Sequence, residues 1–164
     1  MATTTATKKK PETKKTPKAM EAIKLLRADH RLVNGLFEEY ENTTSMKKKR
    51  ELVAQICTEL TVHAQIEEEI FYPAVKQALK DKELIPEATV EHNTLKQLIA
   101  EVEGKEPDGE MFDARIKVMS EYVKHHVKEE QTEIFPKAKT TKLDMEELGA
   151  LLMERKEELL AQRL

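Results

Sequence analysis

Residues 63–73 read His-Ala-Gln-Ile-Glu-Glu-Glu-Ile-Phe-Tyr-Pro, and residues 126–136 read His-Val-Lys-Glu-Glu-Gln-Thr-Glu-Ile-Phe-Pro. In both stretches a glutamate follows a histidine by four residues, and an apolar pair precedes a proline. The two stretches begin 63 residues apart, so the second half of the chain repeats the first. This repeat predicts two similar helix hairpins.

The His-x-x-x-Glu spacing places two side chains on one face of a helix. Positions i and i+4 are neighbours on the helix surface, separated by about 6 Å along the axis. His63 with Glu67, and His126 with Glu130, would therefore each direct an imidazole and a carboxylate to the same side. The stretches that precede each histidine are apolar at the same helical phase, so this side should face the interior.

Two further histidines occupy corresponding positions in the helices that precede these motifs. Asp29-His30 aligns with Glu91-His92 at a separation of 62 residues, and each histidine lies within an apolar helix face. A buried imidazole without a partner is costly, so four inward histidines in register require an explanation. A metal site on the bundle axis supplies one. Its predicted ligands are His30, His63, Glu67, His92, His126 and Glu130.

The hydrophobic pattern is helical over most of the chain. Apolar side chains recur at three- and four-residue steps, whereas the alternation typical of strands never persists. Pro73 should kink or end its helix locally. The expected helices cover residues 17–40, 46–79, 86–103, 108–136 and 143–160.

Short loops between the first four helices predict that successive helices run antiparallel. The expected fold is therefore all-α, with an up-down-up-down four-helix bundle over residues 18–140. Residues 141–164 should add a fifth, C-terminal amphipathic helix. Residues 1–17 are rich in Lys and Thr, bear Met1 as the only large apolar side chain and should form a disordered basic tail.

Charge is distributed unevenly along the chain. Residues 1–18 carry six lysines and one glutamate, and the overall net charge of -3 therefore leaves -8 on the remainder. An acidic body is a poor match for nucleic acid or an anionic membrane, so we expect neither as a specific partner. Cys57 is the only cysteine, which excludes an intrachain disulfide. With no apolar run of membrane-spanning length and no signal-peptide pattern, we expect a cytoplasmic protein.

The donor set limits which metal the site would hold. Mixed imidazole and carboxylate ligands suit iron, manganese or zinc. Structural zinc sites favour cysteine-rich tetrahedra, and six ligands exceed what one zinc ion binds. Two irons bridged by two carboxylates would use all six residues. The Glu-x-x-His motif of ferritin-like di-iron bundles is absent, because none of the five histidines follows a glutamate by three residues.

The order of these motifs resembles the hemerythrin-like, or HHE cation-binding, family over about residues 20–140. The family pattern is a lone His, a His-x-x-x-Glu, a second lone His and a second His-x-x-x-Glu. This resemblance implies a four-helix bundle with a non-haem di-iron centre. It also implies that Glu67 and Glu130 bridge the irons together with an oxo or hydroxo group.

One position departs from the oxygen-carrying members of that family, which place a further histidine one turn after the lone histidine of the third helix. That position is Lys96 here. A water, Glu133 or His125 could complete the second metal, although His125 points about 100° away from His126. Simple reversible oxygen storage is therefore not the expected role.

Asp29 and Glu91 each precede a predicted ligand, so they could accept a hydrogen bond that orients an imidazole. Neighbouring residues on a helix face different directions, which argues against that role.

Three functions remain open on the sequence alone. The first is a di-iron protein that binds or senses O2, NO or peroxide, or that buffers iron, without an organic substrate. The second is a di-iron enzyme with peroxidase-like, catalase-like or NO-reducing activity. The third is an interaction protein with a structural metal, whose last helix and basic tail bind an unknown protein partner. We favour the first, because the sequence has no phosphate-binding loop and no nucleophile constellation.

Overall fold

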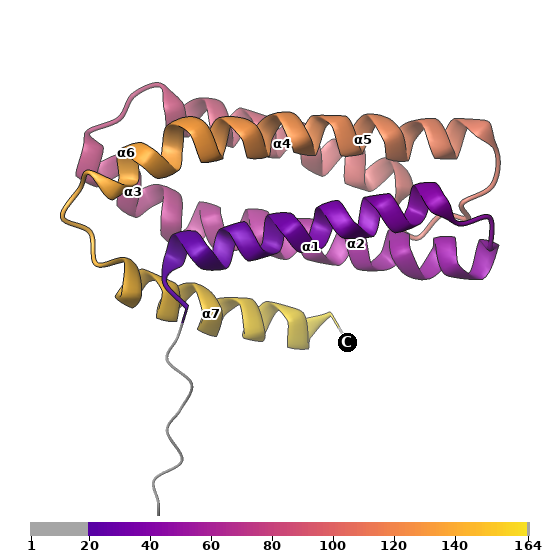
Figure 1. Ribbon diagram of the computed structural model, residues 1–164, viewed down its shortest axis with the longest axis horizontal. Helices are drawn as coiled ribbons and strands as arrows, with labels where there is room; N and C mark the ends of the chain where they lie inside the picture. Colours follow the sequence, from indigo (N-terminus) through magenta and orange to yellow (C-terminus); the bar gives the residue numbers. More distant parts are fainter. Residues whose placement is uncertain (1–19, 164) are drawn as a thin grey trace, which may run out of the picture.

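The structure is a computed structural model that describes residues 20–163, and within that range every regular element is helical. The predicted all-α bundle is thus confirmed (Figure 1). The predicted disordered tail, residues 1–17, lies outside the described residues. The elements are α1 Ala22–Asn42, α2 Met46–Ile66, the π-helix η1 Glu67–Phe71, α3 Tyr72–Leu79, α4 Leu84–Val102, α5 Glu110–Glu129, the π-helix η2 Glu130–Ile134, α6 Phe135–Lys139 and α7 Met145–Gln162.

Two antiparallel hairpins make up the bundle. In Figure 1, α1 and α2 form the lower pair and α4 and α5 form the upper pair, and consecutive long helices run in opposite directions. α7 lies outside the four-helix arrangement and packs along α1, α2 and η1 (Figure 1). Between residues 20 and 163, no helix is both long and apolar enough to cross a membrane.

Side-chain caps decide where several helices begin. The sequence pattern placed the start of the third helix at residue 86, but α4 begins two residues earlier, at Leu84. The carboxylate of Asp81 accepts hydrogen bonds from the backbone N–H groups of Leu84 and Ile85, at 3.2 and 2.8 Å. Pro86 therefore lies in the first turn, where a missing N–H costs nothing. Residues 20 and 21 are not helical and α1 begins at Ala22, where the Glu21 carboxylate accepts a hydrogen bond from the backbone N–H of Lys24 at 2.7 Å. The start expected at residue 17 lies outside the described residues.

Each His-x-x-x-Glu motif leads into a π turn. The Tyr72 N–H bonds to the Glu67 carbonyl, and the Phe135 N–H bonds to the Glu130 carbonyl, five residues back in each case. Pro73 and Pro136 follow directly. The helix does not end at Pro73 but continues to Leu79 in α3, the end expected from the sequence, and the local irregularity is the π turn just before the proline. The wider turn shifts the carbonyl that a proline ring would strike in an uninterrupted α-helix.

The core divides into two apolar clusters along the bundle axis. One cluster, at the end that α7 covers, contains Leu26, Ile66 and Phe135 among its buried side chains. The other occupies the opposite end and contains Val33 and Leu60. The four inward histidines and two glutamates fall between these clusters, so the predicted metal-site residues form one polar layer within an apolar bundle.

Helix α7 packs so closely against the backbone at the start of α1 that Gly149 has no room for a side chain. A Cβ there would lie 2.1 Å from the backbone oxygen of Met20 and 2.9 Å from the backbone nitrogen of Ala22. Gly149→Ala should therefore displace α7 and lower the free energy of unfolding by about 1–3 kcal/mol. Thermal denaturation followed by circular dichroism measures the change.

Gly35→Ala is the matched control, because nothing lies within 4 Å of a Cβ at that position in the middle of α1. It should raise stability by about 0.5–1 kcal/mol through lower backbone entropy. Equal melting temperatures for the two variants would contradict the close contact.

Candidate metal centre

The structure brings all six predicted residues together in the polar layer. They come from α1, α2, η1, α4, α5 and η2, and every one is buried. Both glutamates have no exposed surface. The six residues form two groups of three, in which one donor atom from each residue lies within 4.8 Å of the others. The groups are His30, His63 and Glu130, and Glu67, His92 and His126.

Each glutamate lies between histidines of both groups. The Glu67 Oε1 is 3.0 Å from the His63 Nε2 and 3.4 Å from the His92 Nε2. This placement follows from the sequence spacing, because His63 lies one turn before Glu67 on the same face. One carboxylate thus reaches donors of both groups, as a bridging ligand would.

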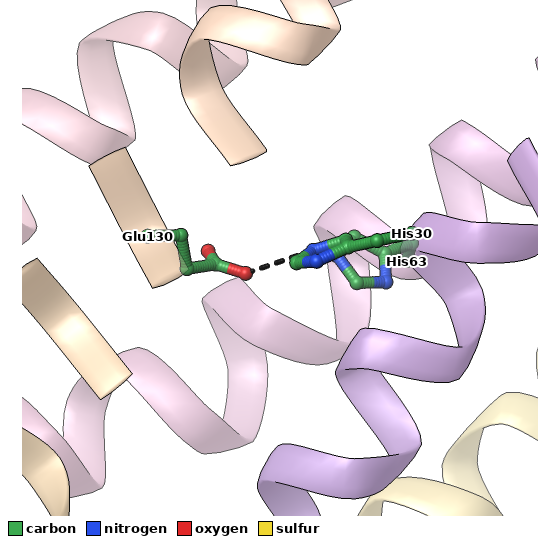
Figure 2. Close-up of side chains that lie close together, drawn as sticks. All are labelled: His30, His63 and Glu130. Atoms are coloured by element: carbon green, nitrogen blue, oxygen red, sulfur yellow. Dashed lines mark ion pairs between the residues drawn. The ribbon is translucent and has the colours of Figure 1, made fainter. Parts of the chain in front are cut away.

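Glu130 spans the groups in the same way. Its Oε1 lies 3.0 Å from the His30 Nε2, and its Oε2 lies 3.6 Å from the His126 Nε2. Figure 2 shows Glu130 extended toward His30 and His63, with the dashed line marking the pair with His30. The two carboxylates enter the layer from opposite hairpins, so each links its own hairpin to the other.

Several fully buried donor atoms in this layer make no hydrogen bond of good geometry, although some lie close to an atom of opposite charge. They are the Nε2 of His30 and of His63, the Nδ1 of His92, both carboxylate oxygens of Glu67, and the Oε1 of Glu130. Buried polar atoms are normally satisfied, and leaving six in one layer costs far more than burying apolar atoms. Cations placed among these lone pairs would satisfy them, and the donor set of four imidazoles and two carboxylates fits that role.

Side chains behind the histidines orient three of the rings. The Asp29 Oδ2 lies 2.8 Å from the His63 Nδ1, and the Glu91 Oε2 lies 3.3 Å from the His126 Nδ1. Asp29 and Glu91 therefore do orient imidazoles. Each contacts the histidine on the other helix of its own hairpin, not the histidine next to it in the sequence. Because helix neighbours face apart, each carboxylate turns toward the next helix. The side-chain amide of Gln131 lies 3.1 Å from the His30 Nδ1.

Tyr72 belongs to the site and was not predicted. Its hydroxyl donates to the Glu130 Oε2 and lies 3.4 Å from the Nε2 of both His92 and His126. Burial raises the pKa of Tyr72 well above its usual value, and the negative charges of Glu130 and Glu67 raise it further, so the phenol remains protonated.

Helical phase explains why Tyr72 was missed. In an α-helix, a residue five positions after Glu67 lies about 140° away from it. The π turn closes a five-residue bond instead, and this brings Tyr72 back toward the Glu67 side. The corresponding residue of the second hairpin is Phe135. Comparison of the two repeats therefore showed only an aromatic residue before each proline and did not single out the Tyr72 hydroxyl.

Lys96, at the position of the missing family histidine, is exposed, and so are His125 and Glu133, the two side chains expected as possible extra ligands. The Lys96 ammonium pairs with Glu68 at 2.8 Å, and its side chain is 51% exposed. His125 is 64% exposed and pairs with Glu129 on the surface. Glu133 is also exposed. A third group of metal-type residues, Glu91, His125 and Glu129, lies at the surface, where acidic residues commonly gather without a metal.

Neighbouring carboxylates raise the pKa of His126 and of His63 and so favour their protonated forms when no metal is bound. Burial alone would lower the pKa of His126, but Glu130 and Glu91 raise it to about 10. Burial acts the same way on His63, and Glu67 and Asp29 raise its pKa well above the usual value. Burial raises the pKa of Asp29, but its contacts with His63 and Lys156 outweigh this and lower it, which keeps the carboxylate ionised.

Comparison with known proteins identifies the class to which this fold and site belong. The sequence model of the hemerythrin HHE cation-binding domain matches residues 21–138, and the chain therefore belongs to that family. All six clustered residues fall within the matched range.

Two individual proteins are similar to the chain. A protein of Nostoc sp. named a DNA nickase is 31% identical over 111 residues, which are 68% of this chain and 31% of that protein. The chain thus spans less than a third of the length of this relative. The crystal structure of an HHE cation-binding-domain protein from Mycobacterium kansasii superposes with a TM-score of 0.75 at 22% identity. That match covers 87% of this chain and 89% of the other, and it shows a shared fold.

Metal uptake should release protons. At pH 8 the metal-free protein retains a proton on His126, whose pKa is about 10, whereas a ligating imidazole must be neutral. Titration calorimetry with Fe2+ in buffers of different ionisation enthalpy should therefore show a buffer-dependent heat, and affinity should increase as pH rises toward 10. A heat independent of buffer, with an affinity that is flat with pH, would contradict this arrangement.

The stability of the metal-free protein should show the converse trend. The pKa of His126 is raised above its usual value of 6.5, so the stabilisation it confers is fully present below pH 6.5 and is lost as pH rises toward 10. Chemical denaturation across that range measures the loss. The metal-loaded protein lacks that proton and should not share this loss.

Proposed function

We propose that the chain is a non-haem di-iron protein that binds or senses a small exogenous molecule such as O2, NO or peroxide. The observation that carries the proposal is the pair of three-residue groups linked by two fully buried carboxylates. Such a set suits two metals that share bridging oxygens. With four imidazoles, two carboxylates and no cysteine, the donors favour iron over a structural zinc.

A small cavity beside the site supports a small ligand. It has a volume of about 20 Å3 and is lined by His30, His63, His92 and His126 together with apolar side chains such as Val123. A space of roughly 10–15 Å3 holds one water molecule, so this cavity admits a molecule of very few atoms. Its apolar lining favours an uncharged one. A bound iron pair would supply electrons and a coordination position to such a molecule.

A surface groove gives a route toward this cavity. The groove, of about 340 Å3, lies between α1 and α5, and it shares His30, Val123 and Val127 with the cavity. A small molecule would pass inward where these shared side chains separate the groove from the cavity. Lys124 and Lys128 line the rim of the groove.

Nucleic acid is not part of the proposal, despite the name of the cyanobacterial relative. The match covers 31% of that protein, so its activity can reside in sequence that has no counterpart here. The net charge of -8 beyond residue 18 also opposes binding to a polyanion.

Removal of either bridging carboxylate should abolish the metal pair. Protein produced with iron should contain two irons per chain with visible absorption, whereas Glu67→Ala and Glu130→Ala should each contain at most one. Elemental analysis and visible spectra measure both properties. His125→Ala is the matched control, because His125 is exposed and outside both groups, and it should retain two irons. Full iron content in all three variants would refute the proposal.

An enzymatic role is the second candidate, and Tyr72 favours it. Its phenol is a buried proton donor within 3.4 Å of two histidines that also line the cavity. If the protein reduces peroxide or NO, Tyr72→Phe should retain both irons yet slow turnover by about 10-fold or more, as expected for loss of a general acid. Stopped-flow assays with each molecule measure the rate. Equal rates in the wild type, Tyr72→Phe and Glu67→Ala would exclude this role.

A further inference from the structure

Helix α7 follows the part of the chain that the family model matches. One of its side chains nevertheless contacts a residue that hydrogen-bonds to a histidine of the candidate metal site. The match ends at residue 138, and α7 spans Met145–Gln162. Leu148, Leu152 and Leu159 bury its apolar side against the cluster at that end of the bundle. Figure 1 shows α7 running beside α1 and α2, the two helices that supply His30 and His63.

Lys156 of α7 contacts the carboxylate that orients His63. The Lys156 Nζ lies 2.5 Å from the Asp29 Oδ1, while the Asp29 Oδ2 lies 2.8 Å from the His63 Nδ1. Each oxygen of Asp29 therefore has its own partner, one on α7 and one on α2. The Asp29 side chain is only 5% exposed and the Lys156 side chain is 17% exposed, so water screens this chain of contacts little.

The contact fixes which nitrogen of His63 faces the site. With the Asp29 carboxylate accepting a hydrogen bond from the His63 Nδ1, the Nε2 is directed toward Glu67, 3.0 Å away. Lys156 in turn restrains the rotation of Asp29 by holding its second oxygen. Its positive charge also offsets the cost of burying an ionised carboxylate.

A second ion pair joins α7 to the helix that carries Glu67. The Arg155 Nε lies 2.7 Å from the Glu69 Oε2, and Glu69 is in η1, two residues after Glu67. This pair is more exposed and contributes less energy than a buried contact. It does position α7 beside the π turn, so the helix contacts both Asp29 on α1 and the segment that follows His63.

In the second hairpin, within residues 20–163, α7 supplies no contact that corresponds to the one between Lys156 and Asp29. Glu91 corresponds to Asp29 and orients His126, but its contact is longer, at 3.3 Å, and its side chain is 17% exposed. The two three-residue groups therefore differ in how firmly one histidine is held. The group of His30, His63 and Glu130 is the one that α7 reinforces.

We propose that Lys156 is a positioning residue that fixes Asp29 and thereby orients His63, so that docking of α7 and metal binding to the His30, His63 and Glu130 group stabilise each other. The inference rests on the proposed metal site. Loss of a group behind a ligating histidine costs about 10–100-fold in metal affinity. Because such coupling is reciprocal, metal should also strengthen the docking of α7.

Lys156→Met tests the first half of the proposal. Co2+ titrated into the full chain in competition with a chelator should give two binding steps. The variant should weaken one step by about 10-fold and leave the other unchanged, and Lys156→Arg should restore it. Arg163→Met is the matched control. Arg163 directly follows α7, seven residues after Lys156, and its guanidinium pairs with Glu103 at 2.6 Å rather than with Asp29.

The outcomes separate this proposal from that of the metal site itself. A wild type that binds no Co2+ pair contradicts the proposed function. A wild type with two steps and a Lys156→Met variant with the same two affinities overturns only the role of Lys156. Equal weakening of both steps in Lys156→Met and Arg163→Met would also overturn it, because that pattern reflects general loss of stability.

Two measurements do not depend on whether Lys156→Met folds well. In the metal-free wild type, nitrogen NMR of labelled histidine should show a slowly exchanging Nδ1 proton on His63, and Lys156→Arg should retain it. Hydrogen exchange of the wild type should show slower exchange of α7 amides with Co2+ than without. Unchanged exchange in α7, in a protein that binds two Co2+, would refute the coupling.

Discussion

Two carboxylates at the centre of a bundle, with no exposed surface, are the constraint on which the rest of this structure depends. Burying a carboxylate without an opposite charge is costly, so Glu67 and Glu130 require positively charged partners in this apolar interior. Four histidines surround them, and both apolar clusters stop short of this layer. Protons on the histidines supply part of that positive charge in the metal-free protein, and the oxygens and nitrogens without a good hydrogen bond are placed where they could hold cations.

The two hairpins meet this constraint with the same contacts in duplicate. The residue after each buried glutamate of the site approaches the Nδ1 of the lone histidine in the other hairpin. Gln131 lies 3.1 Å from the His30 Nδ1, and Glu68 lies 3.9 Å from the His92 Nδ1. This cross-connection makes the site the joint between the hairpins. Departures from the twofold pattern, such as Tyr72 and Lys156, are then the features that make the two three-residue groups different from each other.

The sequence alone was sufficient for the fold and for the cluster of six residues, because both depend on helical periodicity. His30 and His63 share a phase with apolar neighbours, and a fixed four-residue step places Glu67 beside His63. Whether the six bind iron stays a prediction. The role of Tyr72 was not predicted, because its position depends on a π turn that helical periodicity does not encode. The role of Lys156 was not predicted either, because 127 residues separate it from Asp29 and only the docking of α7 brings the two together.

The π turns have a consequence for the two halves of the chain. Each adds one residue to its helix, and both start on the buried glutamate of their hairpin. Each hairpin therefore brings one lone histidine, one His-x-x-x-Glu motif and one π turn, which is half of the candidate site. Neither hairpin forms a three-residue group by itself, because each group takes residues from both hairpins.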